Sequence, residues 1–345
     1  MPLRAVDSET NISVSSIDIS PSEWSMLSTE NSKRAHLRMP CCSAQVVLKR
    51  SRRGLQFFAH KAIGACISGP ETEAHRTLKE LAVRVAREHG FQAETEIRGR
   101  TPTGEEWIAD VLASRGTAQI AVEIQWSAQT IDDTRRRQER YKQSGVRCLW
   151  LLRLAEVPAE YDTPAVRIEG SPELGFQAVV PTGSEAQRMS VEKFLAAAFS
   201  GRLRYGVPVG DQGRLAISVG DIDCWKCGAE TQILTSVYLR FGPHSYSFTI
   251  PGLGDHPDLY TSVRSAFPAE DIFQTIKPRW SSTQSRSYLS NGCAHCGALI
   301  GAFHEHDAWP SQREVASVPI RIDEHWRGVL DGGGSPPAWG VYEHD

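Results

Sequence analysis

The chain has 345 residues, of which 23% are charged and 40% hydrophobic, and its formal net charge is −3. These values are ordinary for a soluble globular protein, and the length allows two domains with a sizeable core. The negative balance excludes binding to nucleic acid through an overall basic field, so such contacts would need local basic patches. No apolar run approaches the roughly 18 residues of a membrane-spanning helix, and no secretory signal is present at the N-terminus. We therefore expect a cytoplasmic protein.

Residues 1–62 are predicted to form a small β-rich N-terminal segment. Residues 45–49 and 55–58 are short, apolar-rich stretches on either side of a basic turn, which is typical of a hairpin. A hairpin that binds no metal is at least as good an interpretation as a zinc site. The zinc interpretation would use four side chains: Cys41, Cys42, His60 and Cys66.

Residues 63–155 contain helical and strand patterns in the order α-β-β-β-α-β. The first helix is predicted to start at residues 68–71, with Ser68 as the cap and Glu71 completing a capping box, and to end at Gly90. The remaining elements follow from apolar periodicity and cap residues. They are strands near 91–98, 105–113 and 119–126, a helix near 131–143 and a buried strand at 146–152.

Acidic residues in two adjacent predicted strands indicate a site for a hard divalent cation. Asp110 and Glu123 lie among apolar neighbours, where a carboxylate is costly to bury unless a cation or donor meets it. Gln125 shares the strand face of Glu123. The alternative is a polar strand end, or an ion pair with an arginine such as Arg147.

Glu71 could complete this site from the helix that precedes the strands. Glu71, His75 and Lys79 are spaced four apart, so a helix would place them on one face. For Glu71 the alternative is helix capping alone. For His75 a satisfied core histidine is more common than a metal ligand.

Five short sequence motifs occur in order across this region, and together they resemble those of a known protein family. They are Phe57-Phe58-Ala59-His60-Lys61, Glu71-Thr72-Glu73-Ala74-His75 with Lys79, WIADVLA at 107–113, AVEIQWS at 121–127 and CLWLL at 148–152. The chain resembles the competence protein CoiA-like family, which is similar to the restriction-endonuclease-like PD-(D/E)XK nucleases in a D…ExQ form. The family's N-terminal cysteine and histidine words are incomplete here, since one cysteine and one histidine are missing.

The resemblance implies that Glu71, Asp110 and Glu123 hold Mg²⁺ or Mn²⁺, with the carbonyl of Ile124 as a further ligand. Gln125 stands where the superfamily has lysine, so it can orient a water only by hydrogen bonds. Candidates for supporting the site or contacting DNA are His75, Lys79, Ser127, Gln129, Arg140 and Tyr141. Two basic patches could also contact DNA: Arg34, Arg38, Lys49, Arg50, Arg52 and Arg53, and Arg135, Arg136, Arg137, Arg140 and Lys142.

Residues 156–220 are predicted as a connector with one helix near 191–199, and residues 311–345 as a tail without readable chemistry. Between them, residues 221–310 contain two Cys-x-x-Cys pairs, each followed by glycine. Four thiolates favour a structural zinc-ribbon-like site, in which a long insert carries strands of its own; a redox dithiol is the rival. The four ligands would be Cys224, Cys227, Cys293 and Cys296.

The sequence therefore predicts an α/β protein with a mixed, restriction-endonuclease-like sheet, a small N-terminal β unit and a C-terminal zinc-ribbon-like module. The expected function is Mg²⁺-dependent hydrolysis of DNA phosphodiesters, by an endonuclease or exonuclease. The resemblance implies a role in DNA uptake or recombination, with proteins of those processes as partners. Two alternatives stay open: an inactive nucleic-acid-binding scaffold with a zinc ribbon, and an RNA-directed or defence nuclease.

Overall fold

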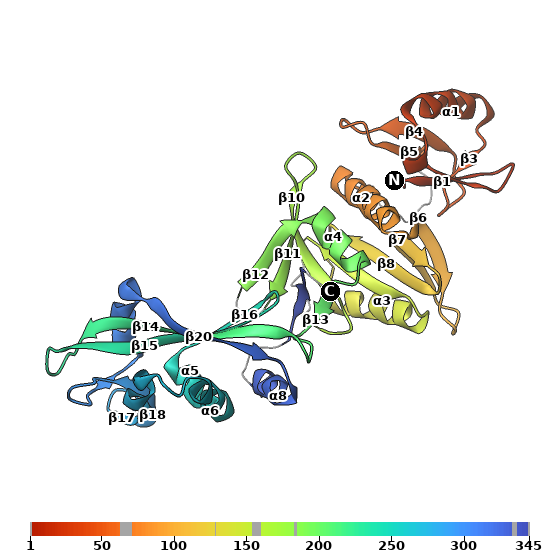
Figure 1. The fold of residues 1–345 in the computed structure, drawn as a ribbon. Helices are drawn as coiled ribbons and strands as arrows, with labels where there is room; N and C mark the ends of the chain where they lie inside the picture. The colour runs from red at the N-terminus through yellow and green to blue at the C-terminus, as the bar shows by residue number, and fades with distance from the viewer. Residues whose placement is uncertain are drawn as a thin grey trace. The chain divides into compact units, whose positions relative to one another are not determined.

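The computed structural model describes residues 2–62, 71–127, 129–153, 160–182, 185–332 and 337–343. The chain forms two compact units. Unit 1 comprises residues 1–180 and 187–203, and unit 2 comprises residues 181–186 and 204–345. Figure 1 shows the elements of both units, coloured from the N-terminus to the C-terminus. None of the described helices is both long and apolar enough to span a membrane.

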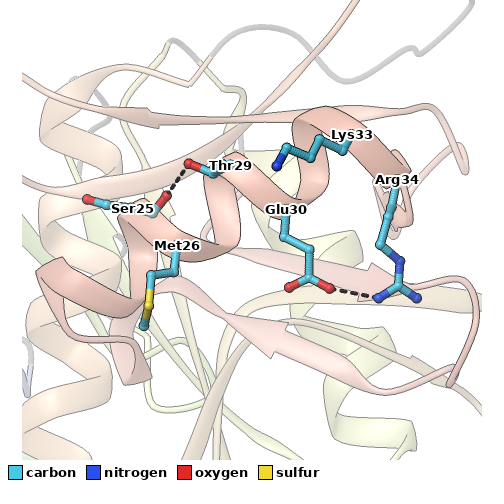
Figure 2. A pocket seen from close by; sticks show the side chains of 6 residues that line it. All are labelled: Ser25, Met26, Thr29, Glu30, Lys33 and Arg34. Carbon is cyan, nitrogen blue, oxygen red and sulfur yellow. Dashed lines mark hydrogen bonds and ion pairs between the residues drawn. The ribbon is translucent and has the colours of Figure 1, made fainter.

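Unit 1 begins with a small β-rich part whose core is formed around Trp24 and Phe58, with ring centroids 5.0 Å apart. The predicted hairpin is present as β4 (Val46–Arg50) and β5 (Gln56–His60). The other elements are β1 (Arg4–Asp7), β2 (Ser13–Ser15), η1 (Ser16–Asp18), α1 (Pro21–Arg34) and β3 (Leu37–Arg38). Figure 2 shows the side chains of α1 that line a pocket, among them Glu30 and Arg34, which form an ion pair of 2.8 Å.

The centre of unit 1 is a mixed α/β layer structure with the elements in the order that the sequence predicts. They are α2 (Glu73–Glu88), β6 (Gln92–Arg100), β7 (Glu106–Arg115), β8 (Ala118–Gln125), α3 (Ile131–Gln143) and β9 (Arg147–Leu152). β6, β7 and β8 are antiparallel neighbours, and β9 runs parallel to β8. The mixed α/β class is therefore confirmed, whereas the restriction-endonuclease-like core topology stays a prediction.

The start of α2 differs from the prediction. Thr72 is the N-cap, and its hydroxyl accepts a hydrogen bond from the backbone N–H of His75 at 3.2 Å. Glu71 precedes the cap, so a capping box formed by Glu71 is wrong. Ser68, the predicted cap, lies outside the described residues. Because Thr72 satisfies the helix terminus, the carboxylate of Glu71 is available for other contacts.

The region predicted as a connector extends the sheet. The predicted helix is present as α4 (Val191–Phe199), but three strands precede it, and β10 lies parallel to β9. The sheet has seven strands in the order β12-β11-β10-β9-β8-β7-β6. The three strands are β10 (Ala165–Ser171), β11 (Gly175–Thr182) and β12 (Glu185–Ser190).

Unit 2 is built on a four-stranded antiparallel sheet in the order β16-β15-β14-β20. Residues predicted as a tail supply one edge strand, because β20 pairs with β14. The sheet strands are β14 (Gln212–Asp223), β15 (Glu230–Phe241), β16 (His244–Phe248) and β20 (Arg313–Arg321). Two smaller sheets contain β13 (Leu203–Tyr205) with β21 (Trp339–Val341), and β17 (Lys277–Ser281), β18 (Arg286–Gly292) and β19 (Leu299–Ile300).

The helices of unit 2 lie mainly in the segment between the two cysteine pairs and after it. α5, α6 and η2 follow β16, and their apolar residues join the core formed by β14 and β15. The insert between the cysteine pairs thus carries strands and helices. The helices are α5 (Ile250–Asp255), α6 (Pro257–Ala266), η2 (Asp271–Thr275), α7 (Ala302–Glu305), η3 (His306–Ser311) and α8 (Glu324–Gly332).

Candidate active site and metal centres

A cavity of about 220 Å³ in unit 1 is lined by three of the charged residues that the sequence indicated, Glu71, Lys79 and Asp110. The end of β5, the residue before the cap of α2, α2 itself, β6 and β7 all contribute side chains to it. Its charged and metal-ligating lining residues are Cys41, His60, Glu71, Lys79, Glu96, Arg98 and Asp110.

Three side chains bring potential metal-ligand atoms together at this cavity. Glu71, His75 and Asp110 each offer one such atom, and these atoms all lie within 4.8 Å of one another. His75 Nε2 is 3.2 Å from Asp110 Oδ2, and His75 Nδ1 is 4.0 Å from Glu71 Oε1. Two carboxylates and an imidazole are a donor set that suits divalent cations such as Mn²⁺, with open positions left for water.

Lys79 is the cation at the centre of these acids. Its Nζ lies 2.7 Å from Glu71 Oε1, 2.8 Å from Glu96 Oε1 and 3.1 Å from Asp110 Oδ1. The side chain is 1% exposed, so it belongs to the buried face of α2. Burial acts to lower the pKa of Lys79, but the carboxylates of Asp110, Glu96 and Glu71 raise it well above its usual value. Lys79 is therefore a permanent positive charge.

Asp110 is held as a carboxylate by several donors. Its Oδ2 accepts a hydrogen bond from the backbone N–H of Ile124 at 2.9 Å, across from β8. Burial acts to raise the pKa of Asp110, yet Lys79, His75 and that backbone N–H keep it well below its usual range. Asp110 is thus favoured as a carboxylate near neutral pH.

Glu96 was not identified from the sequence. Regular alternation along β6 would give it the same face as the exposed Glu94. Its φ of +52° is in the left-handed region, and its carboxylate lies 2.8 Å from Lys79 Nζ. β6 contains two glutamates, Glu94 and Glu96, and its sequence contains no signal for which of them lines the cavity.

Glu123 points into a different environment from that of Asp110. It is 1% exposed, forms an ion pair with Arg137 and accepts a hydrogen bond from the hydroxyl of Tyr141, both on α3. Glu123 is not a member of the 4.8 Å group in the described part of the chain. Burial and the negative charge of Asp110 raise its pKa to about 7. Its participation in a metal site with Glu71 and Asp110 stays a prediction.

Gln125 lies at the end of β8 and lines another cavity, of about 470 Å³, with residues of α3. Its side-chain amide donates to the carbonyl and hydroxyl oxygens of Ser127, at 3.1 and 3.0 Å. Gln129 donates to Thr134 at 2.9 Å. Gln125 and Gln129 therefore lie beside the α3 residues that line this cavity.

The basic patch on α3 is largely paired with acids. Arg140 Nε lies 2.9 Å from Glu105, and Lys142 Nζ lies 2.8 Å from Asp162. Arg135 and Arg136 also form ion pairs, with Glu160 and Asp133 respectively. In the N-terminal patch, Arg34 is paired with Glu9 and Glu30. The positive charge of the α3 patch is therefore partly neutralised by neighbouring acids.

The segment that contains Glu71, Asp110 and Glu123 has a recognisable family signature. Residues 71–163 match the model of the nuclease-like domain of competence protein CoiA. The resemblance to the CoiA-like family is thereby confirmed for this segment, which is similar to the nuclease-like domain of CoiA. No curated protein matches the chain.

Unit 2 contains the second predicted metal centre. Ligand atoms of Cys224, Cys227, Cys293 and Cys296 lie within 4.8 Å of one another. Cys224 Sγ is 3.7 Å from Cys296 Sγ, and Cys227 Sγ is 3.7 Å from Cys293 Sγ. Four sulfurs at this spacing could hold a tetrahedral metal such as zinc.

The two cysteine knuckles have the same local geometry. Gly228 and Gly297 have φ values of +68° and +69°, and each donates its backbone N–H to the first cysteine of its pair. Only glycine adopts this conformation without strain, which is why glycine follows each pair. Burial acts to raise the pKa of Cys293, but the backbone N–H groups of Cys296 and His295 help lower it to about 6, which favours the thiolate.

A third group lies beside the cavity of unit 1. Cys41, Cys42 and His60 offer ligand atoms within 4.8 Å of one another, and Cys42 Sγ is 3.2 Å from His60 Nε2. Cys66, predicted as a fourth member, lies outside the described residues. Three ligands are fewer than a closed structural zinc site uses, so metal binding here stays a prediction.

Proposed function

We propose that the protein is a divalent-metal-dependent nuclease that hydrolyses phosphodiester bonds of DNA. The observation that carries the proposal is the convergence of Glu71, His75 and Asp110 within 4.8 Å at a cavity in a segment similar to the nuclease-like domain of CoiA. A low pKa at Asp110 keeps one ligand anionic. The family match supports nucleic acid as the substrate class.

The residues at the cavity suit Mg²⁺ or Mn²⁺. Glu71 and Asp110 would hold the cation, with His75 as a third ligand or as the partner that orients Asp110. When bound, the cation lowers the pKa of a coordinated water and stabilises negative charge on the phosphate. Lys79 would keep the acidic side chains in place, and its positive charge would reduce the repulsion between their carboxylates.

Glu123 and Gln125 have partners in the structure outside the group of proposed metal ligands. Glu123 can join the metal only if its carboxylate leaves Arg137 and Tyr141. Gln125 borders the α3-side cavity, where Arg136, Arg137 and Arg140 are within reach of a phosphate backbone. We propose that this cavity receives the nucleic-acid strand next to the cleavage site.

We further propose that the four cysteines of unit 2 bind one structural Zn²⁺. Four thiolates leave no open coordination position for a substrate, so the ion would stabilise the fold of unit 2 and take no part in hydrolysis.

One observation favours a second candidate, an inactive nucleic-acid-binding scaffold. The acid and the amide expected on β8 are both engaged elsewhere, Glu123 with Arg137 and Gln125 with Ser127. A decayed site would bind nucleic acid without cutting it.

The proposal is tested by incubating the full chain with plasmid DNA, single-stranded DNA and single-stranded RNA, with Mg²⁺, with Mn²⁺ or with a chelator. We expect metal-dependent cleavage of DNA that Asp110→Ala abolishes. Asp162→Ala is the matched control, because Asp162 is an exposed carboxylate of the same domain, paired with Lys142. Cleavage that Asp110→Ala retains would reject the site, binding without cleavage would support the scaffold, and cleavage of RNA alone would change the substrate.

A further inference from the structure

Glu96 is an unexpected member of the cavity. A glutamate with φ of +52° adopts a left-handed backbone conformation, which is unfavourable for a residue with a side chain. Such strain is retained where surrounding contacts fix it, and it clusters at functional sites. The carboxylate of Glu96 lines the cavity that Glu71, Lys79 and Asp110 also line, and it contacts Lys79 of α2.

The β6–β7 pairing places Glu96 opposite Asp110. Thr95 pairs with Val111 and Ile97 pairs with Ala109, so the intervening residues on the two strands are Glu96 and Asp110. Both carboxylates contact the Lys79 ammonium, at 2.8 and 3.1 Å. The left-handed residue thus lies directly across the strand pair from the proposed metal ligand.

The three donors of Lys79 match three acceptors. A lysine ammonium has three N–H groups, and the three carboxylates around it are those of Glu71, Glu96 and Asp110. Glu71 and Asp110 belong to the 4.8 Å ligand group, whereas Glu96 does not. If a cation draws Glu71 and Asp110 toward itself, Glu96 is the contact that still holds the ammonium.

The charges support the same division of roles. Three carboxylates against one ammonium leave a formal charge of −2, which one divalent cation balances. Oε2 of Glu96 is buried and has no hydrogen-bond partner among the described residues. A buried carboxylate oxygen without a donor is costly, so the site is organised for a positive charge or a water that it holds.

We propose that Glu96 is a positioning residue of the metal site, which acts by holding Lys79 and, through Lys79, the ligands Glu71 and Asp110. This inference rests on the proposed metal-dependent function. Glu96 lies on β6, whereas the predicted acids Asp110 and Glu123 lie on β7 and β8.

The test measures Mn²⁺ binding to the full chain by isothermal titration calorimetry. We expect Glu96→Gln to weaken Mn²⁺ binding by roughly 10- to 100-fold, as loss of a supporting partner does in metal sites. Glu94→Gln is the matched control, since Glu94 is an exposed glutamate of the same strand, and we expect no change in affinity. An unchanged affinity in Glu96→Gln would overturn the inference.

A double-mutant cycle distinguishes positioning from direct ligation. If Glu96 acts through Lys79, then Glu96→Gln has no further effect on Mn²⁺ affinity in a Lys79→Met background. Fully additive effects would overturn the positioning role. Asp110→Ala separates the two proposals: if it abolishes Mn²⁺ binding while Glu96→Gln changes nothing, the metal site stands and the role of Glu96 fails. If Asp110→Ala leaves binding intact, the proposed metal site itself is rejected.

Discussion

The carboxylate of Glu123, which is 1% exposed, is paired with the guanidinium of Arg137, which is 34% exposed. Arg137 also lies over the ring of Trp150, 5.1 Å from its centroid, so the pair is fixed by packing on β9. This relationship connects β8 to α3 through a buried charge. Glu123 is thus engaged outside the cluster of potential metal ligands formed by Glu71, His75 and Asp110.

Removing Arg137 should destabilise unit 1 in a pH-dependent way. In Arg137→Met, Glu123 loses its charged partner, and an unpaired buried carboxylate costs roughly 3 kcal/mol. The pKa of Glu123 is about 7 even with the arginine present, so below that pH the group takes up a proton and the cost shrinks. Chemical denaturation should show a large loss of stability at pH 8 and a small one at pH 5.

The control for this prediction is Arg136→Met. Arg136 is the neighbouring arginine, 72% exposed, and its pair with Asp133 lies at the surface. We expect a change below about 1 kcal/mol at either pH. Equal losses of unfolding free energy in the two variants would show that the buried Glu123–Arg137 pair stabilises the protein no more than an exposed pair does.

Gln125→Ala should have a much smaller effect on DNA cleavage than Asp110→Ala. A residue that acts in proton transfer contributes roughly 100- to 10,000-fold to the rate. Gln125 instead donates hydrogen bonds to Ser127 and lines the α3-side cavity. We therefore expect kcat/KM to decrease by less than about tenfold, mainly because KM rises. Initial rates over a range of DNA concentrations measure this, and a loss as large as that of Asp110→Ala would place Gln125 at the reacting atoms.

The purified protein should contain zinc that depends on Cys296. Replacing one of four thiolates opens the site, so Cys296→Ser should lower the zinc content by about one equivalent per chain in elemental mass spectrometry. Cys148→Ala is the control, because Cys148 is a buried thiol of β9 in unit 1. Zinc content that is the same in both variants would contradict the assignment. A further equivalent lost in Cys42→Ser would place metal at Cys41, Cys42 and His60.

Acid should weaken unit 2 through His244. This histidine of β16 is 1% exposed, and its burial lowers its pKa from 6.5 to about 4. As the pH falls below 6.5, the unfolded chain takes up a proton that the folded chain does not accept until about pH 4. The free energy of unfolding therefore decreases across this window, by up to roughly 3 kcal/mol from this one group.

The measurement compares denaturation of the wild type and His244→Phe between pH 7 and pH 4. Phenylalanine keeps a ring beside Tyr246 and Tyr342 and removes the titration, so its stability should depend less on pH. His325→Phe, at an exposed position, should behave as the wild type. A pH dependence that is the same in all three proteins would rule out His244 as the cause.

Local patterns in the sequence determined much of the architecture and the two cysteine knuckles. The helix near 131–143, the helix near 191–199 and the strand at 146–152 follow from apolar periodicity and cap residues, which act between near neighbours. The two knuckles follow likewise from Cys-x-x-Cys-Gly, since a short loop and a left-handed glycine are local requirements. The convergence of Glu71 with Asp110 was foreseen because a family resemblance supplied the long-range relationship.

Only the tertiary structure decided which acids share an environment. Glu96 lines the cavity and contacts Lys79, whereas Glu123 is paired with Arg137 and Tyr141 of α3. The start of α2 at Thr72 frees Glu71 for Lys79 in the same way. A sequence records which residues can carry charge. Which charges meet depends on strand register, backbone conformation and helix packing, and these are fixed only when distant segments come together.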